Sequence, residues 1–385
     1  MINIAIKIGE ILTIHSIIGG VRIMKRVIFS PMKYIQGVNE LAHICDYALS
    51  LNIKEAYAIV DPFILANYAQ TIESSFKQHQ IPLVTEAFHG ECCQTEIYQL
   101  QKKIEDYSTN VIIGIGGGKT LDTAKAVAYF SKLPVIIIPT IASTDAPCSA
   151  LSVLYTDDGL VDHYLLLDQN PNIVIVDTNV IAKAPTRLLV AGMGDALATY
   201  FEARACYQSH AITNSGGVCS LAALQLAKLC YETLLTDGLK AKQATDQKIA
   251  TKALENIVEA NTYLSGIGFE SGGLAAAHAI HNGLTVLKEC HSMYHGEKVA
   301  FGTLVQLVLE KAPQKEIETV LNFCRSIGLP TTLKALGITH PTKEQLMAVA
   351  TASCSPSETI HHLPFNVTPE DVYHAILVAD QLGQS

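Results

Sequence analysis

The sequence lacks the features that mark nucleic-acid-binding proteins, membrane proteins and cysteine-ligated zinc proteins. Only 16% of the residues are charged, no segment is rich in lysine or arginine, and the formal charge is −9. Nucleic acid and anionic membranes attract a clustered positive field, so this charge argues against both partners. No C-x-x-C pair occurs. Any metal site must therefore use histidine and carboxylate ligands.

The ten cysteines show no disulfide pattern. They are scattered, and the only close pair, Cys92 and Cys93, is adjacent in the chain and poorly placed to bridge. We therefore expect reduced thiols and a cytoplasmic location. At 385 residues with 49% apolar content, the chain is long enough for two domains with buried cores.

The N-terminal segment has no recognisable targeting signal. Residues 1–22 are apolar but broken by Lys7, Glu10 and His15, and the apolar run at 11–21 is too short to cross a bilayer. We interpret residues 1–23 as an extension produced by a non-native upstream start. A first strand is expected at Met24–Ile28.

Short β-rich runs alternate with amphipathic helical stretches up to about residue 185. The runs at 56–60, 111–115, 135–138 and 173–176 are typical of a parallel sheet. Between 152 and 167, two alternating runs flank Asp157-Asp158-Gly159, which predicts a β-hairpin. Later stretches at 221–235 and 249–264 have helical spacing. We predict an α/β fold with a Rossmann-like domain at 24–184, an all-helical domain at 185–385 and a site between them.

A glycine-rich turn follows the strand expected at 111–115. Gly116, Gly117 and Gly118 precede Lys119-Thr120 and a helix start, so backbone N–H groups and the helix dipole could hold a pyrophosphate. Packing of strand on helix is the alternative explanation. Neither a Walker A loop nor a strict G-x-G-x-x-G fingerprint fits, because residue 113 is Ile and residue 119 is Lys.

Asp61 follows the strand at 56–60, at the sheet edge where nucleotide riboses are bound. A carboxylate there would accept ribose hydroxyls and repel a 2′-phosphate, which favours NAD over NADP. The alternative is an ordinary aspartate in a turn after a strand.

Three residues in the second half form a candidate metal site. Asp195 lies among small apolar neighbours in Gly192-Met193-Gly194-Asp195-Ala196, where an unpaired charge is costly. His278 and His281 lie on one helical face, and His295 follows Tyr294. Taken singly, the histidines fit ordinary core or cap roles, whereas an Asp with two His fits a catalytic zinc site.

Together these segments resemble the iron-containing alcohol dehydrogenase superfamily, which includes dehydroquinate-synthase-like relatives, from residue 24 onward. The resemblance rests on the loop 116–125, on Pro139-Thr140-Ile141-Ala142-Ser143-Thr144-Asp145, and on the segments around Asp195, His278 and His295. It implies the fold of dehydroquinate synthase. It also implies metal ligands at Asp195, His278 and His295, and dinucleotide contacts at a larger set: Gly118, Lys119, Asp122, Thr140, Ser143, Ser149, Leu151 and Tyr155.

The chain departs from the iron-type members at one position. Where they have a further histidine one turn after the aspartate, this chain has Thr199. Three ligands remain, which resembles the zinc-dependent, glycerol-oxidising branch and favours one Zn2+ per subunit. The resemblance implies oxidation of glycerol and related vicinal diols, with zinc polarising the hydroxyls and NAD+ accepting the hydride.

Two further residues have expected roles. By resemblance Asp145 faces the substrate, where it would bind a terminal hydroxyl; a helix cap is its alternative role. His281 would relay the released proton or orient the site.

Three other functions stay open at the sequence level. A glycerol 1-phosphate dehydrogenase would need a second anion site; near the metal segments no obvious arginine cluster occurs, although Lys288, His291 and Lys298 offer charge. A dehydroquinate-synthase-like lyase would return the hydride to its product, and a non-catalytic binding protein would lack the metal. The resemblance also implies a symmetric homo-oligomer, with an octamer as the size considered.

Overall fold

The computed structural model describes residues 16–18 and 21–385. The predicted N-terminal extension, residues 1–23, falls largely outside the described residues. Its described part forms two short antiparallel strands, β1 (Ser16–Ile18) and β2 (Val21–Ile23).

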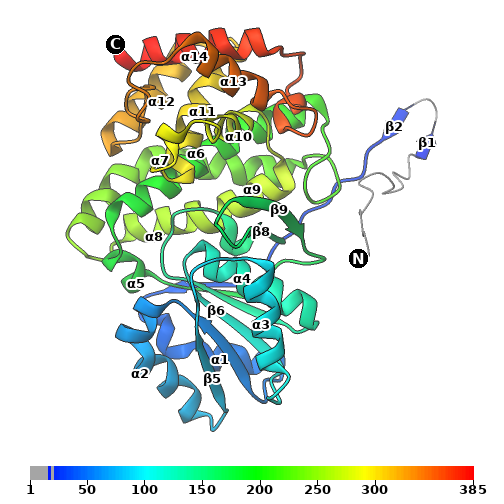
Figure 1. The fold of residues 1–385 in the computed structure, drawn as a ribbon, viewed down its shortest axis with the longest axis vertical. Helices are drawn as coiled ribbons and strands as arrows, with labels where there is room; N and C mark the ends of the chain where they lie inside the picture. The colour runs from blue at the N-terminus through cyan, green and yellow to red at the C-terminus, as the bar shows by residue number, and fades with distance from the viewer. Residues whose placement is uncertain (1–15, 19–20) are drawn as a thin grey trace.

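A six-stranded sheet is the centre of the first half of the molecule (Figure 1), and every pair of neighbouring strands in it is parallel. The strand order is β3-β10-β7-β6-β4-β5. The bounds are β3 Lys33–Gly37, β4 Ala56–Val60, β5 Leu83–Ala87, β6 Val111–Gly116, β7 Val135–Pro139 and β10 Ile173–Asp177. The four strands predicted from the sequence are confirmed as β4, β6, β7 and β10. In these four strands every residue is buried, because helices cover both faces of the sheet.

The predicted hairpin is confirmed as β8 (Leu151–Tyr155) and β9 (Val161–Leu166), which pair antiparallel. Gly159 has a φ of +83° at the turn, a conformation that glycine adopts without strain. The hairpin does not join the six-stranded sheet. It packs against α4 (Gly118–Ser131), where the Val153 N–H donates to the Asp122 carboxylate over 3.1 Å.

The strand predicted at Met24–Ile28 is wrong. This segment makes one parallel bridge, between Arg26 and Val218, and the Lys25 carbonyl accepts from the Val218 N–H over 2.9 Å. Its residues favour strand locally, but the edge of the sheet is occupied by β3. The segment instead lies against the loop that precedes α7.

Helices α1 (Ile44–Ala48) and α2 (Pro62–Gln78) cover one face of the sheet. Helices α3 (Gln94–Ile104) and α4 cover the other face, and a short helix, α5 (Thr178–Lys183), follows β10. Alternate residues of each strand point to opposite faces, so Ile113 packs with the first pair and Ile112 with the second.

The second half, residues 186–385, contains helices and no strand. Its long helices are α6 Thr186–Ser209, α7 Leu221–Asp246, α8 Lys252–Glu259, α9 Ser265–Gly272, α10 Ala276–Leu284, α11 His295–Leu309, α12 Gln314–Ile327, α13 Lys343–Ser353 and α14 Pro369–Gln384. Helices α8 and α9 are joined without a break by a π-helical turn, Ala260–Leu264. The predicted order of a parallel-sheet half followed by a helical half is confirmed; the predicted boundary between residues 184 and 185 stays a prediction.

The two halves share one apolar core. A single cluster of buried residues extends from Ile112 and Ile137 of the sheet through Leu121 of α4 to Phe201 and Phe301 of the helical half. Within the described part of the chain, no helix has the length and apolar character needed to cross a membrane.

Candidate metal and nucleotide site

Close packing between α6 and α11 places the first candidate ligands side by side. A Cβ added to Gly194 would lie 2.3 Å from the Gly296 carbonyl oxygen, and a Cβ on Gly296 would lie 1.8 Å from the Ala191 carbonyl oxygen. Only glycine allows these backbones to approach so closely. The approach sets Asp195, in the middle of α6, beside His295 at the start of α11.

Asp195, His278 and His295 meet as the sequence predicts. Asp195 Oδ1 lies 3.1 Å from His295 Nε2 and 3.3 Å from His278 Nε2, and the three candidate ligand atoms lie within 4.8 Å of one another. The Asp195 side chain is only 1% exposed. One oxygen and two imidazole nitrogens converging at this spacing fit a zinc ion with further coordination positions open to substrate.

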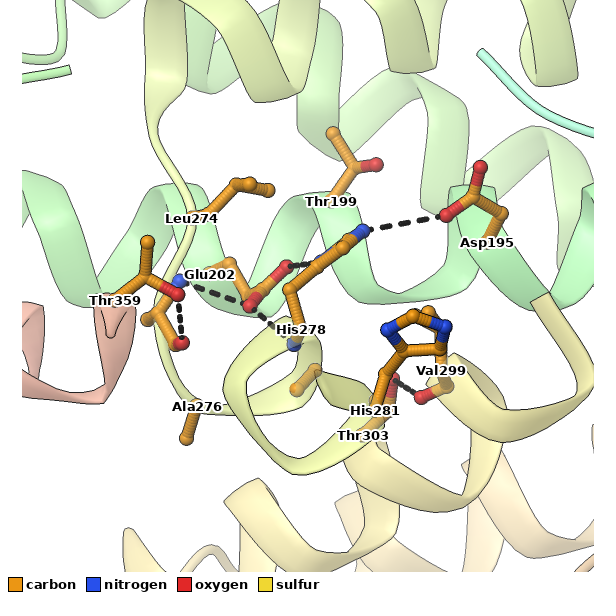
Figure 2. Close-up of polar contacts among 12 residues, drawn as sticks. Asp195, Thr199, Glu202, Leu274, Ala276, His278, His281, Val299, Thr303 and Thr359 are labelled. Atoms are coloured by element: carbon orange, nitrogen blue, oxygen red, sulfur yellow. Dashed lines mark hydrogen bonds and ion pairs between the residues drawn. The ribbon is translucent and has the colours of Figure 1, made fainter. Parts of the chain in front are cut away.

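Both histidines are oriented through their other ring nitrogen. His278 Nδ1 lies 2.6 Å from Glu202 Oε2 (Figure 2), and His295 Nδ1 lies 3.0 Å from His281 Nε2. Glu202 is fully buried in α6, seven residues after Asp195. A carboxylate behind a ligating histidine is typical of zinc sites, because it fixes the ring and raises its basicity. The donor set therefore fits the zinc ion that the resemblance implies.

The charges of the site perturb its pKa values. Burial alone would raise the pKa of Asp195, but His295 and His278 outweigh it and hold that pKa well below its usual range. Burial would lower the pKa of His278, yet Glu202 and Asp195 raise it well above its usual range. Burial, reinforced by the charge of His295, lowers the pKa of His281 well below its usual range. Divalent zinc at these atoms would take the place of the His278 proton.

Asp145 lies directly beside this trio. Its backbone N–H donates to Asp195 Oδ2 over 3.3 Å, and its Oδ2 accepts from the Ser265 hydroxyl over 2.8 Å. The Ser265 hydroxyl is also 2.8 Å from that of Thr199. Burial, followed by the charge of Asp195, raises the pKa of Asp145 well above its usual range. The alternative role as a helix cap is not supported, because the Asp145 side chain makes no capping hydrogen bond.

The π-helical turn completes this arrangement. Within it, the buried Asn261 amide donates to the Ala142 carbonyl over 3.0 Å and to the Leu189 carbonyl over 3.2 Å. These bonds tie the segment after β7 to α6, and the turn places Ser265 against Asp145. π-helical turns inside α-helices are frequent at functional sites.

The glycine-rich turn lines a pocket of about 420 Å³ together with Asp61, Lys119 and Thr120. The glycines serve different needs. A Cβ on Gly114 would lie 2.6 Å from Ala124 Cβ, so Gly114 is required by strand-to-helix packing. A Cβ on Gly118 would meet no atom within 4 Å. Since nothing in the chain itself needs glycine at 118, the open space is consistent with a cradle for an oxygen-rich ligand such as the NAD pyrophosphate.

The carboxylate of Asp61 has two roles in the structure. It caps α2 by accepting from the Phe63 N–H over 2.9 Å, and it also lines the pocket beside Gly117 and Gly118. The sequence alternatives, a turn aspartate and a ribose acceptor, are therefore compatible with each other.

Four of the remaining residues predicted to contact the dinucleotide lie in or near segments that touch the glycine-rich turn. Lys119 Nζ pairs with Glu91 Oε2 over 2.7 Å and lies 4.6 Å from the centre of the Tyr155 ring. Thr140 is buried where β7 ends, and its N–H donates to the carbonyl of the last residue of β6 over 3.0 Å. Ser143 is half-buried in the loop that follows β7.

Asp122, Ser149 and Leu151 are engaged with the protein itself. The Asp122 carboxylate pairs with the fully buried Lys125 over 2.9 Å. Ser149 is wholly buried, and its hydroxyl donates to the Ala146 carbonyl over 3.0 Å. The Leu151 carbonyl accepts from Lys125 Nζ. The bond between Lys125 and Leu151 joins α4 to the hairpin.

Sequence reasoning missed three residues that the structure brings to the site. Glu202 could have been found, because residues 195, 199 and 202 follow the i, i+4, i+7 spacing of one helical face. Ser265 and Asn261 carried no local signal, since their partners are 120 and 119 residues away.

The chain is similar to known proteins of one family. Residues 31–178 match the family model described as iron-containing alcohol dehydrogenase. The chain is 55% identical over 361 residues to a glycerol dehydrogenase of Citrobacter freundii, covering 94% of this chain and 99% of that one. It is 57% identical over 362 residues to a glycerol dehydrogenase of Escherichia coli O6:H1, covering 94% and 98%.

A solved structure gives the same answer for the fold. The crystal structure of glycerol dehydrogenase from Schizosaccharomyces pombe superposes with a TM-score of 0.90 at 41% identity, covering 94% of this chain and 92% of that one. More than half of the residues are identical to the Citrobacter and Escherichia relatives over nearly their whole length. The chain therefore belongs to the iron-containing alcohol dehydrogenase family.

Proposed function

We propose that this protein oxidises glycerol, and related vicinal diols, to the corresponding ketone with NAD+ as the hydride acceptor. The observation that carries the proposal is the convergence of Asp195, His278 and His295 within 4.8 Å beside Asp145. The glycerol dehydrogenases among its relatives support the same reaction.

The metal-binding atoms would be Asp195 Oδ1, His278 Nε2 and His295 Nε2. A zinc ion bound there supplies Lewis-acid polarisation of a hydroxyl group. Glu202 and His281 orient the two imidazoles, each through an Nδ1 contact of 3.0 Å or less. The lack of a histidine at Thr199, whose hydroxyl is bonded to Ser265, supports zinc over iron.

Asp145 would select the substrate. Its Oδ2 is held by Ser265 and its backbone by Asp195, so the carboxyl group is fixed next to the metal-binding atoms. A fixed acceptor at this point can bind a second hydroxyl of a diol, which a simple alcohol lacks. His281 is buried behind His295 and contacts its Nδ1. It would orient His295 or relay the released proton.

The dinucleotide would bind along the glycine-rich turn. Gly118 leaves room for the pyrophosphate, and Gly117, Asp61 and Lys119 line the same pocket. The other residues proposed to contact it are Asp122, Thr140, Ser143, Ser149, Leu151 and Tyr155. NAD+ supplies the hydride acceptor; the protein supplies its position relative to the substrate.

We extend the proposal to a homo-oligomer in the cytoplasm. Leu221, Leu229 and Leu239 of α7 are 64%, 48% and 43% exposed, and exposed apolar side chains along one helix support a contact between subunits.

The deciding experiment measures NADH formation at 340 nm from NAD+ with glycerol, glycerol 1-phosphate or ethanol, before and after chelation and after zinc is restored. Turnover of glycerol that chelation abolishes and zinc restores is the expected result. Turnover of the phosphate ester alone would move the assignment to the phosphate-specific reaction. No NADH with any substrate would overturn the dehydrogenase proposal and leave a lyase or a binding protein.

A further inference from the structure

A row of polar side chains extends behind His295, away from the candidate metal position. His295 Nδ1 lies 3.0 Å from His281 Nε2, and His281 Nδ1 lies 3.0 Å from Asn282 Oδ1. Asn282 Nδ2 then donates to both oxygens of Glu358, over 3.2 and 3.0 Å. Four residues from α11, α10 and the segment before Thr359 are thereby connected in one line.

The direction of the hydrogen bonds in this row follows from the chemistry of its ends. An ionised carboxylate can only accept, so Glu358 must face the Nδ2 amide group of Asn282. The Asn282 oxygen consequently faces His281, whose Nδ1 must then be the protonated nitrogen. A neutral His281 protonated on Nδ1 has a lone pair on Nε2.

The other end of the row requires the same direction. A histidine that binds a metal through Nε2 keeps its proton on Nδ1 and needs an acceptor there. His281 Nε2 is the group that lies within reach of His295 Nδ1.

We propose that Glu358, Asn282 and His281 form a directional hydrogen-bond relay that fixes the tautomer of His295 and presents its Nε2 lone pair to the metal. This inference rests on the proposed function, because it assumes that His295 is a ligand. The three residues are positioning residues. They orient the ring of His295, as Glu202 orients the ring of His278. Glu202 contacts His278 directly, whereas the half-buried Glu358 acts on His295 through the Asn282 amide and the neutral His281 ring.

The experiment measures zinc affinity of the full-length protein by competition with a chelating dye. Asn282→Leu removes the acceptor of His281, and Glu358→Gln removes the group that sets the amide direction. We expect Asn282→Leu to weaken zinc binding about 10- to 100-fold and Glu358→Gln to weaken it less. Saturating zinc should restore turnover in both variants.

A matched control and a double variant separate this role from a structural one. Asn256 of α8 donates to the carboxylate of Asp237 of α7 over 2.7 Å. Asn256→Leu therefore breaks an amide-to-carboxylate bond like that of Asn282, but away from the candidate metal site. It should lower the melting temperature of the zinc-free protein comparably while leaving zinc affinity within about twofold. Because Glu358 acts through Asn282, the Asn282→Leu/Glu358→Gln double variant should bind zinc as Asn282→Leu does.

Unchanged zinc affinity in both single variants, or additive losses in the double variant, would overturn the relay. If Asn282→Leu does not fold, Glu358→Gln alone decides, and unchanged affinity in it overturns the relay. If the unmodified protein binds zinc but the variants behave as just described, only the relay fails. If the unmodified protein does not bind zinc, the proposed function fails and the relay fails with it.

Discussion

The conversion of Glu202 to glutamine should test the metal site most sharply, because the replacement cannot satisfy both sets of partners. Glu202 Oε2 faces His278 Nδ1 over 2.6 Å, while Oε1 accepts from the N–H groups of Ala275 and His278 over 2.8 and 3.0 Å (Figure 2). Every partner on the backbone side is a donor. A glutamine has one accepting end and one donating end.

Either orientation of that glutamine is unfavourable to the zinc-bound protein. If the amide NH2 faces the two backbone N–H groups, two buried hydrogen bonds are lost, each costing about 1–3 kcal/mol. If the amide NH2 faces His278 Nδ1, that nitrogen must accept, and the proton moves to Nε2, where the metal would bind. The zinc-free protein should adopt the second orientation, and zinc must reverse it.

The lower end of this range, about 2 kcal/mol for two bonds, corresponds to a roughly 30-fold loss of zinc affinity. Chelator competition at constant pH measures it directly. Glu270→Gln is a matched control, since buried Glu270 also accepts from a backbone N–H, that of Ala150 over 2.7 Å, but has no metal ligand as partner. Zinc affinity within about threefold of the unmodified protein in Glu202→Gln would refute the reasoning.

Three further outcomes are expected. Gly118→Val should leave the melting temperature nearly unchanged but weaken NAD+ binding about tenfold, or about 1.4 kcal/mol, measured by titration, whereas Gly114→Ala should destabilise the fold through its 2.6 Å contact with Ala124; equal NAD+ affinity in Gly118→Val would count against the cradle. Asp145→Asn should lower kcat/KM for glycerol about 2- to 10-fold, as expected for a typical hydrogen bond worth about 0.5–1.5 kcal/mol, with little change for 1-propanol; equal losses for both substrates would contradict a role in selecting diols. Because the pKa of His278 is raised in the folded protein, its protonated form stabilises the zinc-free protein fully below about pH 6.5, and this stability should be lost as the pH rises through the raised pKa; melting curves that are flat above that pH would disprove it.

The sequence predicted the sheet well because its central strands are uniformly apolar. Ala56–Val60 and Val111–Gly116 are buried at every position, and such short runs between helical stretches have one common solution, the parallel sheet. The Met24–Ile28 prediction failed because strand formation depends on a free partner. Local preference cannot report that β3 already occupies the edge.

The sequence pointed to the three candidate ligands but not to the groups that contact them in the structure. Asp195 stood out because a lone carboxylate among glycines and alanines needs a cation. Glu358 and Ser265 looked like ordinary polar residues, since their meaning depends on partners 76 and 120 residues away. Contacts over such separations follow from the folded topology, which a local pattern does not contain.

The apolar core shared by the two halves limits how the molecule can be recombined. Residues of β6 and β7 belong to the same buried apolar cluster as Phe201 and Phe301. Each half therefore has apolar side chains that only the other half covers. A chimera could join the nucleotide half of this chain to the helical half of a distant relative. Its side chains at the contact between the halves would have to fit in volume, and its site residues would have to be compatible as well. Exchanging the halves therefore requires repacking the side chains between them.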